Sequence, residues 1–108
     1  YRGQVLIQTR RHVPSLAELT PAEGAALGPV IQRLAVALRV VVHPELVYLD
    51  CYMEVVRHAH FFLTPRYPGT PPEFWRLEVT YWPGAPRVAP TGLGPLGDEL
   101  RAALRAPE

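Results

Sequence analysis

The sequence predicts a single α+β domain in which one long amphipathic helix packs on a sheet. Several segments of the 108-residue chain have the β-branched and aromatic composition of strands, and one capped segment has helical periodicity. A chain of this length buries well over half of its unfolded surface and needs no disulfides to form a core. It leaves no room for a second core, so residues 1–108 are treated as one domain.

Composition narrows the functional classes. The chain is 48% hydrophobic and 19% charged, as is usual for soluble globular proteins, and its net charge of +1 indicates no nucleic-acid polymer as partner. Every basic residue is Arg, which excludes lysine chemistry. Cys51 is the only cysteine, so we expect no disulfide framework and a cytoplasmic location. We also expect no apolar run of the about 20 residues that a membrane span requires.

The first half of the chain contains a strand and a capped helix. Residues 3–9 are rich in β-branched side chains, and Ser15 and Glu18 have the spacing of a capping box around a short helical turn. Thr20 as N-cap, Pro21 at the first position and Glu23 reaching back to the cap predict a helix to about residue 39. Its apolar stripe, which requires a sheet as partner, consists of Leu27, Val30, Ile31, Leu34 and Leu38.

The second half begins with more strands and ends with a helix. Residues 46–52 form the second predicted strand, and a histidine-bearing strand over 54–65 ends near Pro65, because proline donates no ladder hydrogen bond. Residues 74–82 are either an edge strand or an ordered aromatic arm. Residues 83–95 are too rich in Pro and Gly for helix or strand, and a short C-terminal helix begins at residue 97.

The histidine-bearing segment is the candidate site. If it is a strand, one face carries Glu54, Val56, His58, His60 and Phe62, while the other carries Val55, Ala59, Phe61 and Leu63. Two imidazoles on one face lie about 6.6 Å apart along the strand. They are close enough to hold one phosphate or one metal ion.

The His-x-His pair has three interpretations. The first is two surface or internally satisfied histidines. The second is a metal site in which His58 and His60 are joined by Glu54 or His12. The third is phosphoryl chemistry, in which one neutral imidazole attacks phosphorus and its neighbours donate hydrogen bonds to the oxygens. Spacing alone does not separate metal from phosphate.

The order of these pieces resembles the histidine triad (HIT) superfamily. The segments that carry the resemblance are residues 3–13, the capped helix, Val47-Tyr48 and residues 54–67, and residues 82–86 resemble bacterial members similar to diadenosine tetraphosphate hydrolases. The resemblance implies an antiparallel sheet with the long helix packed across it, a short C-terminal helix and a homodimer. It also implies that a segment of the family upstream of Tyr1, which supplies part of the base and ribose pocket, is missing.

The family resemblance assigns roles to individual residues. It implies hydrolysis or transfer at the α-phosphate of a nucleotide or dinucleotide conjugate, such as a dinucleoside polyphosphate or phosphoramidate, without cofactor, bound metal or membrane. His60 matches the nucleophile that forms a nucleotidyl-histidine intermediate, and His58 matches the histidine that supports it. His12 matches an upstream histidine that approaches the phosphate, and Glu54 stands where many members have a phosphate-binding Gln or Asn.

Three residues depart from the family pattern. Phe62 occupies the position of the third histidine and has no hydrogen-bond donor, a loss that typically costs about 10²–10³ in rate. The carboxylate of Glu54 would repel an anionic phosphate unless it is protonated or turned away, and Thr9 replaces a common proline. Three functions therefore stay open: a nucleotide hydrolase or transferase, a degenerate domain that binds a nucleotide or a protein without turnover, and a metal-dependent hydrolase using His58 and His60.

Overall fold

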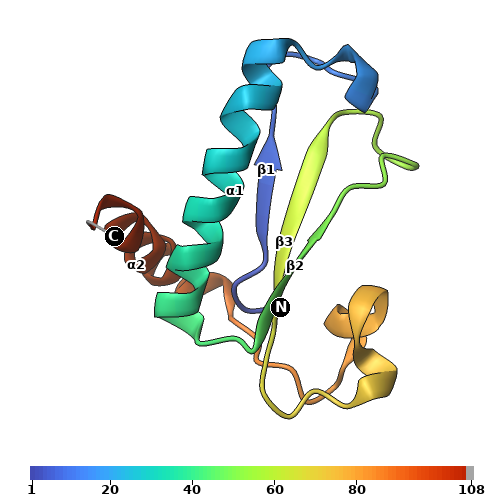
Figure 1. The fold of residues 1–108 in the computed structure, drawn as a ribbon. Helices are drawn as coiled ribbons and strands as arrows, with labels where there is room; N and C mark the ends of the chain where they lie inside the picture. The colour runs from blue at the N-terminus through green and yellow to red at the C-terminus, as the bar shows by residue number, and fades with distance from the viewer. Residues whose placement is uncertain (107–108) are drawn as a thin grey trace.

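The centre of the fold is an antiparallel sheet with strand order β1-β3-β2, crossed on one face by a long helix (Figure 1). This computed structural model describes residues 1–106. The strands are β1 (Val5–Gln8), β2 (Leu46–Asp50) and β3 (His60–Arg66), and the helices are α1 (Pro21–Val42) and α2 (Leu93–Arg105). The architecture confirms the predicted antiparallel α+β fold.

Helix α1 begins as predicted and ends a few residues later. The Thr20 hydroxyl accepts a hydrogen bond from the Glu23 backbone N–H at 3.1 Å, and the Glu23 carboxylate accepts one from the Thr20 backbone N–H at 2.8 Å. The helix continues to Val42, where His43 takes a left-handed conformation (φ 53°) that ends it. Its buried stripe packs on the sheet through Leu38, which is fully buried against Leu63 of β3.

One expectation about α1 is corrected. By length and composition alone this helix could cross a membrane, with a mean hydropathy of 1.6 over its most apolar window, of which 17% is buried. The core helix of a soluble protein meets the same criterion, so this is weak evidence for a membrane segment. In the structure, the stripe of α1 that faces inward packs on the sheet.

The predicted strand over 54–65 is wrong in its first half. Residues 51–59 form an irregular loop, and β3 begins only at His60. Met53 turns the chain in a left-handed conformation (φ 61°), and the Ala59 N–H donates to the Val13 carbonyl instead of to a strand. Side chains 54–59 therefore do not alternate across a sheet, and Val55, expected on the apolar face, is 94% exposed.

Pro65 lies inside the central strand, although the strand was expected to end near it. It pairs with Val47 of β2, and its carbonyl accepts a hydrogen bond from the Tyr1 hydroxyl. The N–H and C=O of one strand residue point to the same side, so the N–H that proline lacks would face Tyr1, beyond the end of β1. No ladder bond is lost there, and β3 continues to Arg66.

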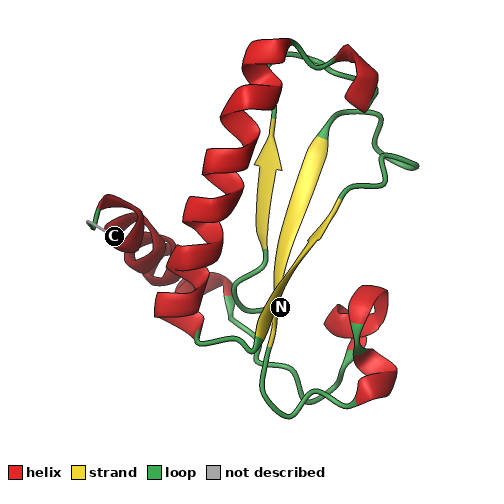
Figure 2. Ribbon diagram, in the orientation of Figure 1, coloured by secondary structure: helices red, strands yellow, loops and turns green. Residues whose placement is uncertain are grey.

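The C-terminal part differs from the prediction in two places. Residues 74–82 form no strand: 3₁₀ helices at Pro72–Phe74 and Arg76–Tyr81 make the ordered arm, which lies away from α1 (Figure 2). Helix α2 starts at Leu93 instead of residue 97, because Pro95 falls in its first turn, where no N–H is needed. Its inner face packs against α1 through Leu96 and Leu100.

Candidate active site

The candidate nucleophile, His60, lies on the sheet face that α1 leaves uncovered. Alternation along β3 buries Phe61 and Leu63 in the core, while His60 and Phe62 point to the opposite face and stay partly exposed. The first residue of a strand combines a fixed backbone with access from the adjoining loop. This position suits a side chain that must meet a ligand.

The ring of His60 is held in one tautomer. Its Nδ1 lies 2.7 Å from the backbone carbonyl oxygen of His58. A carbonyl only accepts hydrogen bonds, so Nδ1 carries the proton and Nε2 presents a free lone pair. The ring of Phe62 meets that of His60 edge-on, with 5.5 Å between centroids and an interplanar angle of 84°. His60 is thus oriented as a neutral imidazole with its nucleophilic nitrogen unoccupied.

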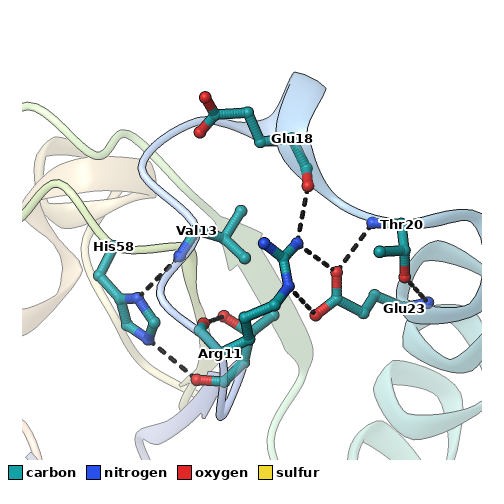
Figure 3. A network of polar contacts seen from close by, with 7 residues as sticks. Arg11, Val13, Glu18, Thr20, Glu23 and His58 are labelled. Carbon is teal, nitrogen blue, oxygen red and sulfur yellow. Dashed lines mark hydrogen bonds and ion pairs between the residues drawn. The ribbon is translucent and has the colours of Figure 1, made fainter.

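His58 lies in the loop before β3, and both of its ring nitrogens contact the backbone (Figure 3). Nε2 donates to the Thr9 carbonyl at 2.9 Å, and Nδ1 accepts from the Val13 N–H at 3.3 Å. These partners fix its tautomer as well. The imidazole therefore connects the loop before β3 to the segment after β1, and its backbone carbonyl orients His60.

The other two predicted site residues are not brought against His60 by any hydrogen bond. His12 is exposed and stacks on His58, with 5.5 Å between ring centroids and an interplanar angle of 9°. Glu54 is exposed in the 51–59 loop. The structure therefore places His12 beside His58, and leaves Glu54 on the surface of that loop.

A polar network anchors the segment between β1 and α1 (Figure 3). Arg11 donates to the Glu23 carboxylate at 2.8 Å and to the Glu18 carbonyl at 2.8 Å. The hydrogen bond from Arg11, followed by the one from the Thr20 N–H, lowers the pKa of Glu23 to about 2. The cap of α1 thus holds the segment that carries Val13, the backbone partner of His58.

Two residues on the same sheet face were missed by the sequence reasoning. Gln8 of β1 is the direct partner of His60, and Asp50 of β2 is the direct partner of Phe62. Burial raises the pKa of the Asp50 carboxyl, and the nearby charge of His60 opposes the rise. Alternation along residues 46–50 identifies the face of Asp50, but only the register of β2 on β3 places it beside His60.

Two pockets flank the sheet. One, of about 270 Å³, is lined by Tyr48, Leu49, Asp50, Tyr52, Arg76 and Leu77, and so borders the His60 face through Asp50. Another, of about 220 Å³, lies between β1 and the first half of α1. Its walls include Ile7 and Phe61, which point to the helix side of the sheet, so it does not adjoin the His60 ring.

The metal interpretation finds no donor set in the described part of the chain. Among residues 1–106, no three or more His, Cys, Asp or Glu side chains are grouped as metal ligands. His58 uses both ring nitrogens on backbone groups, which leaves neither for an ion. The proposed third ligand Glu54 is exposed in a loop instead of sharing a strand face with His60.

Solved structures with this architecture are histidine triad proteins. A histidine triad protein from Sinorhizobium meliloti matches with a TM-score of 0.76 and 19% identity over 93% of this chain and 73% of that one. A zinc-bound histidine triad family protein from Mycobacterium smegmatis matches with a TM-score of 0.69 and 25% identity over 96% of this chain and 70% of its own.

A hypothetical histidine triad nucleotide-binding protein from Sulfolobus tokodaii matches with a TM-score of 0.72 and 18% identity over 94% of this chain and 69% of its own. No protein-family model and no curated protein matches the sequence. The agreement is in strand order, helix placement and overall path. The chain therefore has the histidine triad fold.

Proposed function

We propose that this protein is a nucleotide phosphohydrolase or nucleotidyl transferase in which His60 attacks the α-phosphate of a nucleotide conjugate. The observation that carries the proposal is the orientation of His60, whose Nδ1 is bonded to the His58 carbonyl at 2.7 Å while Nε2 is free. An oriented neutral imidazole on an accessible sheet face meets the requirement for nucleophilic catalysis. The histidine triad fold of the solved relatives agrees with this chemistry.

The proposed reaction has two steps. The Nε2 lone pair of His60 bonds to phosphorus, and the bond from phosphorus to the leaving group breaks. The His60 ring then carries positive charge, which the His58 carbonyl stabilises through the Nδ1–H hydrogen bond. Water next attacks phosphorus, the bond to Nε2 breaks, and the nucleoside monophosphate leaves. One difficult displacement at phosphorus thus becomes two easier ones.

The remaining residues keep their proposed roles in modified form. His58 supports His60 through its backbone carbonyl, since its ring is bonded to Thr9 and Val13. His12 and Glu54 are proposed to approach the phosphate only once a ligand draws the 51–59 loop and the segment after β1 together. Diadenosine polyphosphates and adenosine phosphoramidates are the proposed substrates.

A second function, nucleotide binding without turnover, is favoured by the residues around His60. Phe62 lies edge-on against the His60 ring and offers no donor to a phosphate oxygen. Asp50 adds a carboxyl group on the same face. A site that lacks a donor and contains an acid could retain the nucleoside contacts and lose catalysis.

The two functions are separated by a binding measurement and a turnover measurement on the same protein. Calorimetric titration with AMP tests binding, and product analysis with diadenosine tetraphosphate and adenosine 5′-phosphoramidate tests turnover. The proposed enzyme gives product, and His60→Ala abolishes it, while His43→Asn, at the far end of α1, has no effect. Binding without product supports the second function. Equal turnover by His60→Ala would refute the role of His60.

We also propose a homodimer. The strand order β1-β3-β2 makes β1 and β2 the outer strands of the described sheet, and β2 exposes Leu46 and Leu49. Open strand edges are templates for pairing with another chain. Light scattering that gives twice the 12.1 kDa chain mass is the expected result, and a monomer at micromolar concentration would contradict it.

A further inference from the structure

The first step of the proposed reaction needs a proton for a poor leaving group, and Phe62 cannot provide it. The direct cross-strand partner of Phe62 is Asp50, at the end of β2. Partners in an antiparallel pair point to the same face, with Cβ atoms about 4.5–5.5 Å apart. Asp50 is therefore the acidic side chain that the sheet register brings to the position where a donor is missing.

The position of Asp50 relative to His60 also suits an in-line displacement. His60 precedes Phe62 by two residues on the same strand face, so Asp50 and His60 are diagonal neighbours across β2 and β3. Such neighbours have Cα atoms about 7–8 Å apart. A phosphoryl group placed between them would face the Nε2 nucleophile on one side and direct its leaving atom to the carboxyl group on the other.

We propose that Asp50 in its protonated form is the general acid that donates a proton to the leaving group. This inference rests on the proposed function of His60. In the first step Nε2 bonds to phosphorus, the bond from phosphorus to the leaving nitrogen or oxygen breaks, and that atom takes the Asp50 proton. In the second step the Asp50 carboxylate takes a proton from the attacking water, and His60 leaves. The starting protonation states are then restored.

The surroundings of Asp50 agree with a carboxyl that holds its proton. Its pKa is raised by burial, and His60 on β3 is the group that opposes the rise. The other titratable groups at this position, Tyr48, Tyr52 and the arm residue Arg76, line the 270 Å³ pocket together with Asp50. That pocket provides space for a leaving group on the β2 side of the carboxyl.

The inference narrows the substrate class. A general acid matters most when the departing group is strongly basic, and it contributes about 10²–10⁴ in rate. We infer that nucleoside phosphoramidates, whose amine must be protonated to leave, are preferred over conjugates with weakly basic leaving groups.

The test compares two substrates that differ only in the leaving group. Adenosine 5′-phosphoramidate needs a proton on nitrogen, whereas the p-nitrophenyl ester of AMP releases a stable nitrophenolate. Asp50→Asn is expected to lower kcat/KM by about 10²–10⁴ for the phosphoramidate and by less than about tenfold for the ester. Because kcat/KM reports the first irreversible step, the later hydrolysis of the intermediate does not affect the comparison.

Matched controls identify which proposal fails. Asp98→Asn, an exposed acid on α2, should change neither rate, and Asp50→Glu should recover part of the phosphoramidate rate. The limb of the wild-type pH profile that falls as Asp50 ionises should be absent from Asp50→Asn. Loss of both rates in His60→Ala with no preferential loss in Asp50→Asn overturns the role of Asp50 alone. Unchanged rates in His60→Ala overturn the proposed function itself. If Asp50→Asn does not fold, Asp50→Ser is measured against the same ratio.

Discussion

Replacing His58 by Ala is expected to destabilise the protein through its backbone partners. The Val13 N–H, on a residue with 0% exposure, loses its acceptor, and an unsatisfied buried group costs about 1–3 kcal/mol. The Thr9 carbonyl belongs to a partly exposed residue, so water can replace that hydrogen bond. With the lost packing of the ring, we expect a cost of about 2–3 kcal/mol. In a domain of this size the melting temperature then falls by roughly 10–20 °C.

Thermal unfolding followed by circular dichroism measures this effect, with His12→Ala as the matched control. His12 is exposed and contacts His58 only by stacking at 5.5 Å, so its removal should change stability by less than about 0.5 kcal/mol. Urea unfolding at fixed pH gives the free energies directly. Equal melting temperatures for His58→Ala and the wild type would refute the structural role of the His58 ring.

Three further predictions concern the scaffold. Gly3→Ala should cost about 1–3 kcal/mol, because Gly3 has φ +86° and an added Cβ would lie 3.0 Å from Pro65 Cγ; urea unfolding at an unchanged cost of zero would contradict this. Arg11 lowers the pKa of Glu23 to about 2, so the stabilisation from ionised Glu23 is present above its ordinary value of 4.5 and lost as the pH falls through about 2. The difference in urea midpoint between wild type and Glu23→Gln should therefore shrink over that range, and a constant difference would contradict the ion pair. Leu38→Ala, at a fully buried position, should cost about 2–5 kcal/mol, and a cost below 1 would show that the core relaxes around the cavity.

Local signals predicted the first half of the fold well. The start of α1 depends on Thr20 and Glu23, which lie three residues apart, so its capping box is readable from the sequence. The strand predicted over 54–59 failed because that segment is shaped by distant partners. His58 contacts Thr9 and Val13, and these interactions join residues more than forty positions apart.

The candidate site was only partly visible in the sequence. His60 was identified by its motif, and the structure adds the tautomer, because the hydrogen bond to the His58 carbonyl depends on the path of the loop. Asp50 was missed because nothing in residues 46–50 states which β3 residue each one faces. Only the register, in which Asp50 opposes Phe62, places an acid near His60.

The most direct test of the account is to trap the nucleotide on the protein. Wild-type protein is mixed with the p-nitrophenyl ester of AMP, quenched within the first turnover and analysed by mass spectrometry under conditions that preserve phosphohistidine. The account predicts one adenylyl group bonded to His60, and none in His60→Ala. Product formation with no adduct, or an adduct that persists in His60→Ala, would contradict His60 as the nucleophile.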